Sequence, residues 1–184
     1  MGDLKENVGR MSNIIKDFLD VSQIEEKRLK LKKESTNLEK LIKEIVKALS
    51  PMADARNCKI SLKVKNKIPV LKLDKNKIEQ VIRNILNNAI SYSSKKNTIS
   101  ISLEKRKNDV LISCSDNGIG ISKKEEKNIF KKFYRSEKAM MLSTEGTGLG
   151  LFISKAIIKQ SNGKIWFKSE KDKGTVFFFT LPIK

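Results

Sequence analysis

The feature that most constrains the fold is the spacing of its hydrophobic residues, which follows a helical period in some segments and a strand period of two in others. Between residues 75 and 91, apolar residues return every three or four positions, which predicts a helix with one buried stripe. Alternating apolar positions predict strands at 98–104, 109–115, 165–169 and 175–181. Because helices and strands are grouped rather than strictly alternating, the sequence predicts an α+β fold, a two-layer sandwich with a mixed sheet covered on one face by helices.

Residues 1 to about 28 form a further predicted helix with a heptad seam. The seam residues are Leu4, Val8, Met11, Ile15 and Phe18. A single helix cannot bury such a seam, so we expect it to pack in a bundle or a dimer.

Two more helices and two short strands complete the prediction. One helix begins near Thr36 or Asn37, with Glu39 placed for a capping box, and its pattern breaks at Pro51 and Asn57. Strands are expected at 60–64 and 70–73. The last helix runs from about Leu149 to Gln160 and ends at Ser161-Asn162-Gly163, where the glycine suits a left-handed cap.

The net charge is +18, yet only six of the 39 basic residues are arginine, and the basic residues are spread along the whole chain. Nucleic-acid surfaces usually cluster Arg and Lys with interleaved aromatic residues, so we expect no nucleic-acid partner. A solvated basic surface, an acidic partner protein and a bound triphosphate all remain compatible with the charge. Cys58 and Cys114 lie in apolar alternating stretches and are expected to be buried and reduced.

Gln80, Asn84, Asn88 and Tyr92 recur every four residues and therefore share one face of the predicted helix. Residues 84–94 carry no charge in a chain that is 33% charged. The amides could form a structural network, or they could bind a hard cation such as Mg²⁺ together with phosphate oxygens.

Two glycine-rich turns follow. Asp116-Asn117-Gly118-Ile119-Gly120 comes directly after a strand, and its carboxylate could accept from a purine amine, although alone the motif is more typical of a structural turn. Residues 146–150, Gly-Thr-Gly-Leu-Gly, open a helix and offer backbone N–H groups to phosphates. The spacing matches neither a P-loop nor a dinucleotide fingerprint, and the absence of histidine excludes the eukaryotic-type kinase signature.

These motifs occur in the order amide box, D-x-G-x-G, F-x-x-F-Y-R (Phe130, Phe133, Tyr134, Arg135) and G-x-G-x-G-L. In this order they resemble the catalytic ATP-binding domain of bacterial sensor histidine kinases, which has the histidine-kinase/gyrase-type fold. The resemblance implies that residues 31–184 are this domain. It also implies that residues 1–30 are the second helix of the dimerisation and phosphotransfer hairpin.

The resemblance implies catalytic roles for Asn84, Asn88 and Arg135, with Mg²⁺ at Asn88 and a mobile lid at residues 136–147. Family members often carry a lysine at the position of Ser91, and Lys95 is the candidate replacement. The ATP-binding residues that it implies are Asn84, Asn88, Tyr92, Asp116, Gly118, Gly120, Ile121, Tyr134, Arg135, Gly146, Thr147, Gly148, Leu149, Gly150, Leu151 and Thr175.

The implied activity is that of a protein-histidine kinase that transfers the ATP γ-phosphate to a histidine outside this chain and signals through a response regulator. The implied parent is a cytoplasmic homodimer, and a membrane anchor in it remains open. Asn84 stands where the related gyrase-type ATPases place a glutamate base, so we expect poor hydrolysis of ATP. The alternative is a non-catalytic regulatory module that binds nucleotide.

Overall fold

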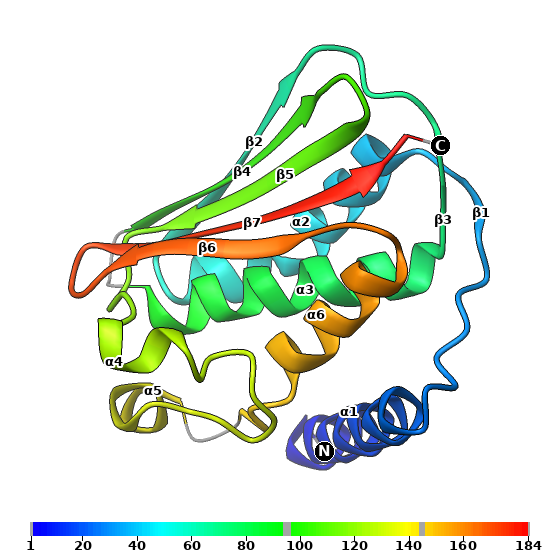
Figure 1. The fold of residues 1–184 in the computed structure, drawn as a ribbon. Helices are drawn as coiled ribbons and strands as arrows, with labels where there is room; N and C mark the ends of the chain where they lie inside the picture. Colours follow the sequence, from blue (N-terminus) through cyan, green and yellow to red (C-terminus); the bar gives the residue numbers. More distant parts are fainter. Residues whose placement is uncertain (1, 94–96, 144–145, 184) are drawn as a thin grey trace.

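The computed structural model describes residues 2–93, 97–143 and 146–183 and contains two layers (Figure 1). The first is a five-stranded mixed sheet in the order β2-β4-β5-β7-β6, in which β2 and β4 are parallel and the other neighbours antiparallel. Its strands are β2 (Cys58–Lys65), β4 (Asn97–Lys105), β5 (Asp109–Asp116), β7 (Gly174–Pro182) and β6 (Ile165–Glu170). Three helices, α2 (Leu38–Ala55), α3 (Lys75–Tyr92) and α6 (Gly150–Gln160), cover one face of it. The predicted α+β sandwich is confirmed.

The core lies between these layers. On β5, Val110, Ile112 and Cys114 point to the helices and are almost completely buried, as alternation along a strand requires. The predicted stripe of α3 is buried against them, from Ile78 to Ala89. Cys58 and Cys114 are both buried and unpaired, as expected.

Helix α2 differs from its prediction at both ends. Asn37 caps it by accepting a hydrogen bond from the Lys40 N–H at 2.9 Å, whereas Glu39 makes no capping box and pairs with Lys43 at 2.6 Å. Pro51 does not break the helix, which continues to Ala55. The chain turns at Asn57, the second predicted break, which adopts a left-handed φ of 55°.

A small second sheet pairs β1 (Glu34–Thr36) with β3 (Leu71–Leu73) in antiparallel register. The sequence indicated β3 but not β1, whose three residues have no apolar alternation. Leu71 and Leu73 are buried, so this pairing closes the end of the core next to α3.

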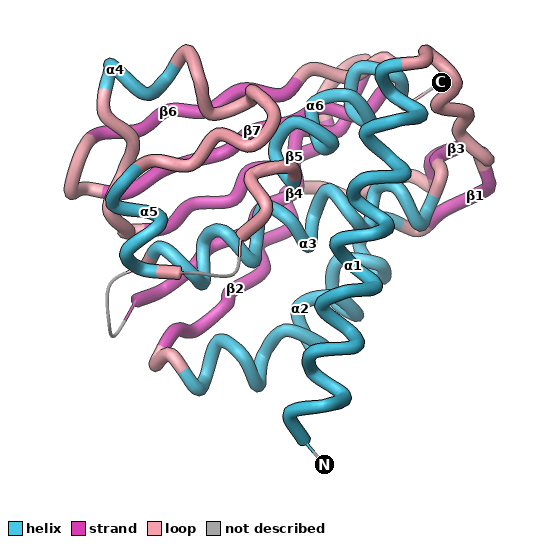
Figure 2. Tube along the Cα trace, turned by 90° about the horizontal axis from the view of Figure 1, so that it is seen from below, coloured by secondary structure: helices cyan, strands magenta, loops and turns pink. Residues whose placement is uncertain are grey.

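Helix α1 (Gly2–Glu25) lies on the outer side of α3 and α6, away from the sheet (Figures 1 and 2). Its attachment is polar on one side, where buried Asp20 pairs with Lys77 and accepts from Gln80 Nε2 at 2.8 Å. Most of the predicted seam is exposed, with Met11 64% and Ile15 57% accessible. The expectation that this helix needs a further partner stays a prediction.

Two short helices lie between β5 and α6, namely α4 (Lys123–Glu126) and α5 (Glu137–Leu142). Helix α5 occupies the segment expected to be an irregular lid, and Ser136 caps it. At the end of α6, Asn162 rather than Gly163 takes the left-handed conformation, with φ 59°. Within the described ranges, no helix is long and apolar enough to cross a membrane.

Candidate functional site

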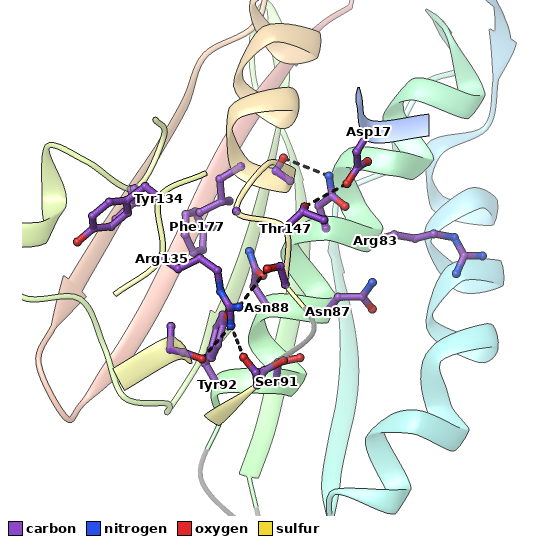
Figure 3. A pocket seen from close by; sticks show the side chains of 18 of the residues that line it. Asp17, Arg83, Asn87, Asn88, Ser91, Tyr92, Tyr134, Arg135, Thr147 and Phe177 are labelled. Carbon is purple, nitrogen blue, oxygen red and sulfur yellow. Dashed lines mark hydrogen bonds between the residues drawn. The ribbon is translucent and has the colours of Figure 1, made fainter. Parts of the chain in front are cut away.

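A large cleft opens at the carboxyl-terminal half of α3, between α1, the α4–α5 segment and the start of α6 (Figure 3). Asn84 anchors α6 to α3, because its Nδ2 donates to the Gly150 carbonyl at 3.1 Å and to Ser154 Oγ at 3.4 Å. A Cβ on Gly150 would lie 3.2 Å from the Asn84 side chain, so a glycine here allows the close approach. Asn88, one turn later, is half-buried and lines the cleft.

The turn after β5 forms the floor at one end of the cleft. Asp116 is 9% exposed, and its Oδ1 accepts from the Gly118 N–H at 2.8 Å. Burial raises the pKa of the Asp116 carboxyl above its ordinary value, and the backbone N–H groups of Gly118 and Thr175 act in the opposite direction. A carboxylate held in this way still presents acceptor capacity to a ligand.

The two glycines of this turn are required by close contacts. Gly118 packs under the carbonyl of Tyr92, which accepts from the Ile119 N–H at 3.1 Å, and so joins the turn to the end of α3. Gly120 has φ 63° and touches the backbone of Glu170 in the β6–β7 hairpin. Both positions lack room for a Cβ, so the motif is fixed by backbone geometry.

Arg135 lines the cleft between α5 and residue Gly146. Its guanidinium donates to three carbonyl oxygens, those of Gly146 at 3.0 Å, Ala139 at 3.1 Å and Ser143. Its Nε is buried and has no partner in the part of the chain that the structure describes. Arg135 therefore connects the end of α5 to Gly146, the first residue of the glycine-rich segment 146–150, which we call the glycine ladder. In this arrangement the charge of Arg135 is directed at carbonyl dipoles.

The glycine ladder enters α6 beside Asn84. Gly148 has φ 71°, and a Cβ there would lie 2.7 Å from the carbonyl carbon of Phe133. Thr147 Oγ1 accepts from the Leu149 N–H at 3.3 Å and donates to Asp17 Oδ2 of α1 at 3.4 Å. Burial raises the pKa of the Asp17 carboxyl, and the Thr147 hydroxyl opposes the rise.

Most of the predicted site residues line this one cleft. They are Asn84, Asn88, Tyr92, Asp116, Gly120, Ile121, Tyr134, Arg135, Gly146, Thr147, Gly148, Gly150, Leu151 and Thr175. Two predicted residues lie elsewhere. Leu149 is completely buried in the core, and Gly118 lies beneath the wall against Tyr92. Ser91 lines the cleft, whereas Lys95 falls outside the described residues.

Sequence reasoning missed the apolar wall and the contribution of α1. Ile119, Ile129 and Phe177 line the cleft next to Asp116, and Asn13 and Asp17 close its other end. The alternation of β7 signalled that Phe177 faces the helices, but no pattern in the sequence placed α1 at the mouth.

The oxygen atoms that line the cleft fit a hard cation whose remaining ligands come from a bound substrate. No cluster of three or more His, Cys, Asp or Glu that could bind a metal occurs among residues 2–93, 97–143 and 146–183. The nearby oxygens are those of the Asn84 and Asn88 amides, and the amide of Asn88 has no hydrogen-bond partner in these same ranges. Neutral amide oxygens are accepted ligands of Mg²⁺ when substrate phosphates complete its shell.

The family model described as "Histidine kinase-, DNA gyrase B-, and HSP90-like ATPase" matches residues 73–184. The chain belongs to this family. The match covers the four sequence motifs of the cleft and leaves α1, β1, α2 and β2 outside it.

Curated relatives of this ATPase-family chain extend the similarity to α1. The Non-motile and phage-resistance protein of Caulobacter vibrioides is 30% identical over 99% of this chain, and the Sensor histidine kinase WalK of Bacillus subtilis is 32% identical over 95%. The chain spans only 22% and 29% of the lengths of these two relatives.

Solved structures show the same fold. The histidine kinase AdeS of Acinetobacter baumannii has a TM-score of 0.80 at 24% identity, with 100% of this chain and 83% of that chain covered. The histidine kinase ThkA in complex with the response regulator TrrA has a TM-score of 0.72 at 25% identity, with coverages of 98% and 52%.

Proposed function

We propose that this chain is the catalytic part of a sensor histidine kinase, which binds ATP with Mg²⁺ and transfers the γ-phosphate to a histidine on another helix of the parent. In this proposal residues 31–184 are the ATP-binding domain and residues 1–30 are the second helix of the phosphotransfer hairpin. The observation that carries it is the convergence of the α3 amides, Asp116, Arg135 and the glycine ladder on one cleft. The similarity to WalK over 95% of the chain supports the same assignment.

In this proposal each wall of the cleft contacts a different part of the bound Mg²⁺–ATP. The carboxylate of Asp116 accepts from the exocyclic amine of adenine, while Ile119, Ile129 and Phe177 pack against the ring. The N–H groups of the glycine ladder and the Asn84 side chain meet the phosphates. Asn88 would hold the Mg²⁺, which would neutralise charge on the phosphates, and Arg135 would turn from its carbonyl partners to the terminal phosphate.

The transfer requires a nucleophile that this chain does not contain, since it has no histidine. A bond forms between a neutral imidazole nitrogen and the γ-phosphorus as the bond to the β,γ-bridging oxygen breaks, and ADP leaves. Asn84 cannot accept a proton near neutral pH, so the cleft does not activate water and transfer to a protein acceptor is favoured.

The proposed partners are the histidine-bearing helix, the second protomer of a homodimeric parent, and a response regulator. The exposed seam of α1 supports the first two, and the complex of ThkA with TrrA supports the third. We place the domain in the cytoplasm because its ligand is ATP and because its two cysteines are unpaired.

The deciding experiment adds the histidine-bearing hairpin of the parent, as a separate chain, to this protein with γ-labelled ATP and Mg²⁺. We expect an acid-labile, base-stable phosphoryl group on the hairpin and little release of phosphate without it. Arg135→Ala and Asn88→Ala should abolish the transfer, while Lys63→Ala on the far strand β2 should not. Nucleotide binding without any transfer would favour the alternative, a regulatory module that senses ATP.

A further inference from the structure

Strand β6 forms one free margin of the sheet, since it pairs with β7 on one side only. The Thr180 N–H donates to the Lys164 carbonyl at 2.8 Å. Counting from Lys164, alternate residues of β6 therefore direct their backbone N–H and C=O groups toward β7 and away from it. The N–H and C=O groups of Ile165, Phe167 and Ser169 consequently point away from β7. Within residues 2–93, 97–143 and 146–183, these outward backbone groups have no hydrogen-bond partner.

A groove runs along this margin. It separates β6 from α4 and Phe130, and Figure 2 shows α4 beyond β6 at the border of the sheet. The side chains of Ile165, Phe167 and Phe130 are half-buried and give the groove an apolar lining. The groove is separate from the nucleotide cleft, with which it shares no lining residue.

The charges around the groove are predominantly positive. Lys123, Lys127 and Lys168 line it and are exposed, and Glu126 is its one acidic lining residue. None of the three lysines has an ion-pair partner in the described part of the chain. This surface therefore attracts a negatively charged partner.

Two aromatic rings of the groove already have one face in contact with another side chain. Trp166 is stacked on Phe178, with ring centroids 5.4 Å apart and planes at 11°. Lys155 Nζ lies 5.1 Å from the centroid of the Phe130 ring. Single-stranded nucleic acid needs open ring faces, so the groove is better suited to a peptide whose main chain pairs with the strand.

We propose that β6 is a docking edge for an extended acidic segment of a partner protein, which adds to the sheet as a further strand. Its main chain pairs with the outward groups of Ile165, Phe167 and Ser169, as in other cases of strand addition. Alternate apolar side chains enter the groove, and acidic side chains meet Lys123, Lys127 and Lys168. The interaction does not depend on the phosphotransfer function.

The opposite margin provides a natural comparison. Strand β2 also has a free edge, and it exposes Lys59 and Lys63. Neither the nucleotide cleft nor the β6 groove includes a residue of β2 in its lining. Exposed lysines on an edge strand discourage unwanted pairing, so the β2 edge serves as a comparison that carries similar charge away from the proposed docking edge.

The test uses the single tryptophan of the chain, Trp166, which lies in the groove. An end-blocked octapeptide of alternating glutamate and valine is titrated into the 184-residue protein, and tryptophan emission is recorded. We expect a saturable change. Lys127→Glu with Lys168→Glu should weaken binding about tenfold, since two attractive charges become repulsive. The matched control, Lys59→Glu with Lys63→Glu, should leave the affinity unchanged.

Two further peptides separate strand addition from simple charge attraction. An acidic peptide with alternate backbone nitrogens methylated cannot donate to β6 and should lose about tenfold or more in affinity. A lysine–valine peptide should not bind. The proposal is overturned if the wild type shows no saturable change, if the methylated peptide binds equally well, or if both lysine pairs matter equally.

Two other occupants give distinct results. Dimerisation of the protein that the Lys127→Glu, Lys168→Glu variant abolishes, detected by analytical ultracentrifugation, would assign the edge to a second copy. Displacement of the acidic peptide by single-stranded oligouridylate would assign the groove to nucleic acid. Either result would overturn the proposal.

Discussion

At the residue scale, the proposed contact of Asp116 with adenine connects the burial of its carboxylate with the choice of base. Adenine presents an amine where guanine presents a carbonyl oxygen, and two facing acceptors leave a desolvated charge unpaired. This mismatch costs on the order of 1–3 kcal/mol, or roughly a tenfold to several-hundredfold preference for ATP over GTP. Asp116→Asn should narrow the gap because its amide can donate to guanine, and circular dichroism should be unchanged. A competition titration of both nucleotides measures the effect.

The raised pKa of Asp116 gives this preference a pH dependence. Because the folded-state pKa lies above the ordinary value, lowering the pH from about 7.5 to about 5 increases the fraction of neutral carboxyl. A neutral carboxyl can donate to the guanine oxygen, so the preference for ATP should fall with pH in the wild type. It should stay flat in Asp116→Asn. A preference that is insensitive to pH in the wild type would contradict this assignment.

In the proposed site, the Asn88 amide would determine how the metal is held. Its neutral amide adds no charge, so we expect Mg²⁺ to bind the nucleotide-free protein only in the millimolar range or more weakly, on the order expected when phosphates are the main ligands. Asn88→Asp should tighten this binding about tenfold or more by adding a charged oxygen ligand. Calorimetry with the control Asn108→Asp, an exposed asparagine outside the cleft, measures the effect. Tight Mg²⁺ binding to the wild-type protein without nucleotide would exclude Asn88 as the ligand.

At the scale of elements, α5 is held by Arg135 rather than by its own sequence. Six residues are too few for a stable isolated helix. Arg135→Lys removes the planar fork that contacts three carbonyl groups and should speed amide exchange at Met140 and Ser143 about tenfold, because charge-assisted hydrogen bonds contribute roughly 1.5–3 kcal/mol. ATP should also change exchange there in the wild type.

The control for this experiment is Lys138→Ala, which removes the exposed pair between α5 and Asp172 and should change exchange only slightly. Hydrogen exchange followed by mass spectrometry or NMR gives the rates. Slow exchange in α5 that neither Arg135→Lys nor ATP alters would argue against a movable lid.

Elements stabilised by their own residue pattern could be predicted from the sequence, whereas elements stabilised by distant partners could not. The stripe of α3 and the alternation of β5 are local patterns, and both elements were predicted to within one residue at each end. Strand β1 and helix α5 were missed because their partners, β3 and Arg135, lie outside each segment. Pro51 was misread because its position late in α2 removes a single N–H from the helix.

The site followed the same rule. The position of the glycines in the two turns could be predicted because their φ values and close contacts allow few residue types. Leu149 could not be separated from its neighbours in the ladder, since only the tertiary structure directs its side chain into the core. Asn162 took the left-handed position because Gly163 was needed elsewhere, packed against the Thr180 carbonyl.

At the scale of the whole molecule, one buried ion pair contributes to the attachment of α1 to the domain. Asp20 is 5% exposed and pairs with Lys77 of α3, so Asp20→Ala leaves Lys77 without its partner. We expect a loss of roughly 2–4 kcal/mol in the free energy of unfolding, together with earlier proteolysis of α1. The matched control is Glu25→Ala, whose pair with Lys132 is exposed and should cost less than about 1 kcal/mol. Equal losses from the two variants in chemical denaturation would show that α1 is not attached through Asp20.

The hydrogen bond between Asp17 and Thr147 couples the position of α1 to the binding of a ligand in the cleft. A phosphate held by the glycine ladder adds negative charge beside a half-buried carboxylate that belongs to a different segment. By thermodynamic reciprocity, whatever factor nucleotide applies to the docking of α1, the docked helix applies to the affinity for nucleotide. A displacement or rotation of α1 caused from outside the domain would therefore change the affinity of the cleft for its ligand.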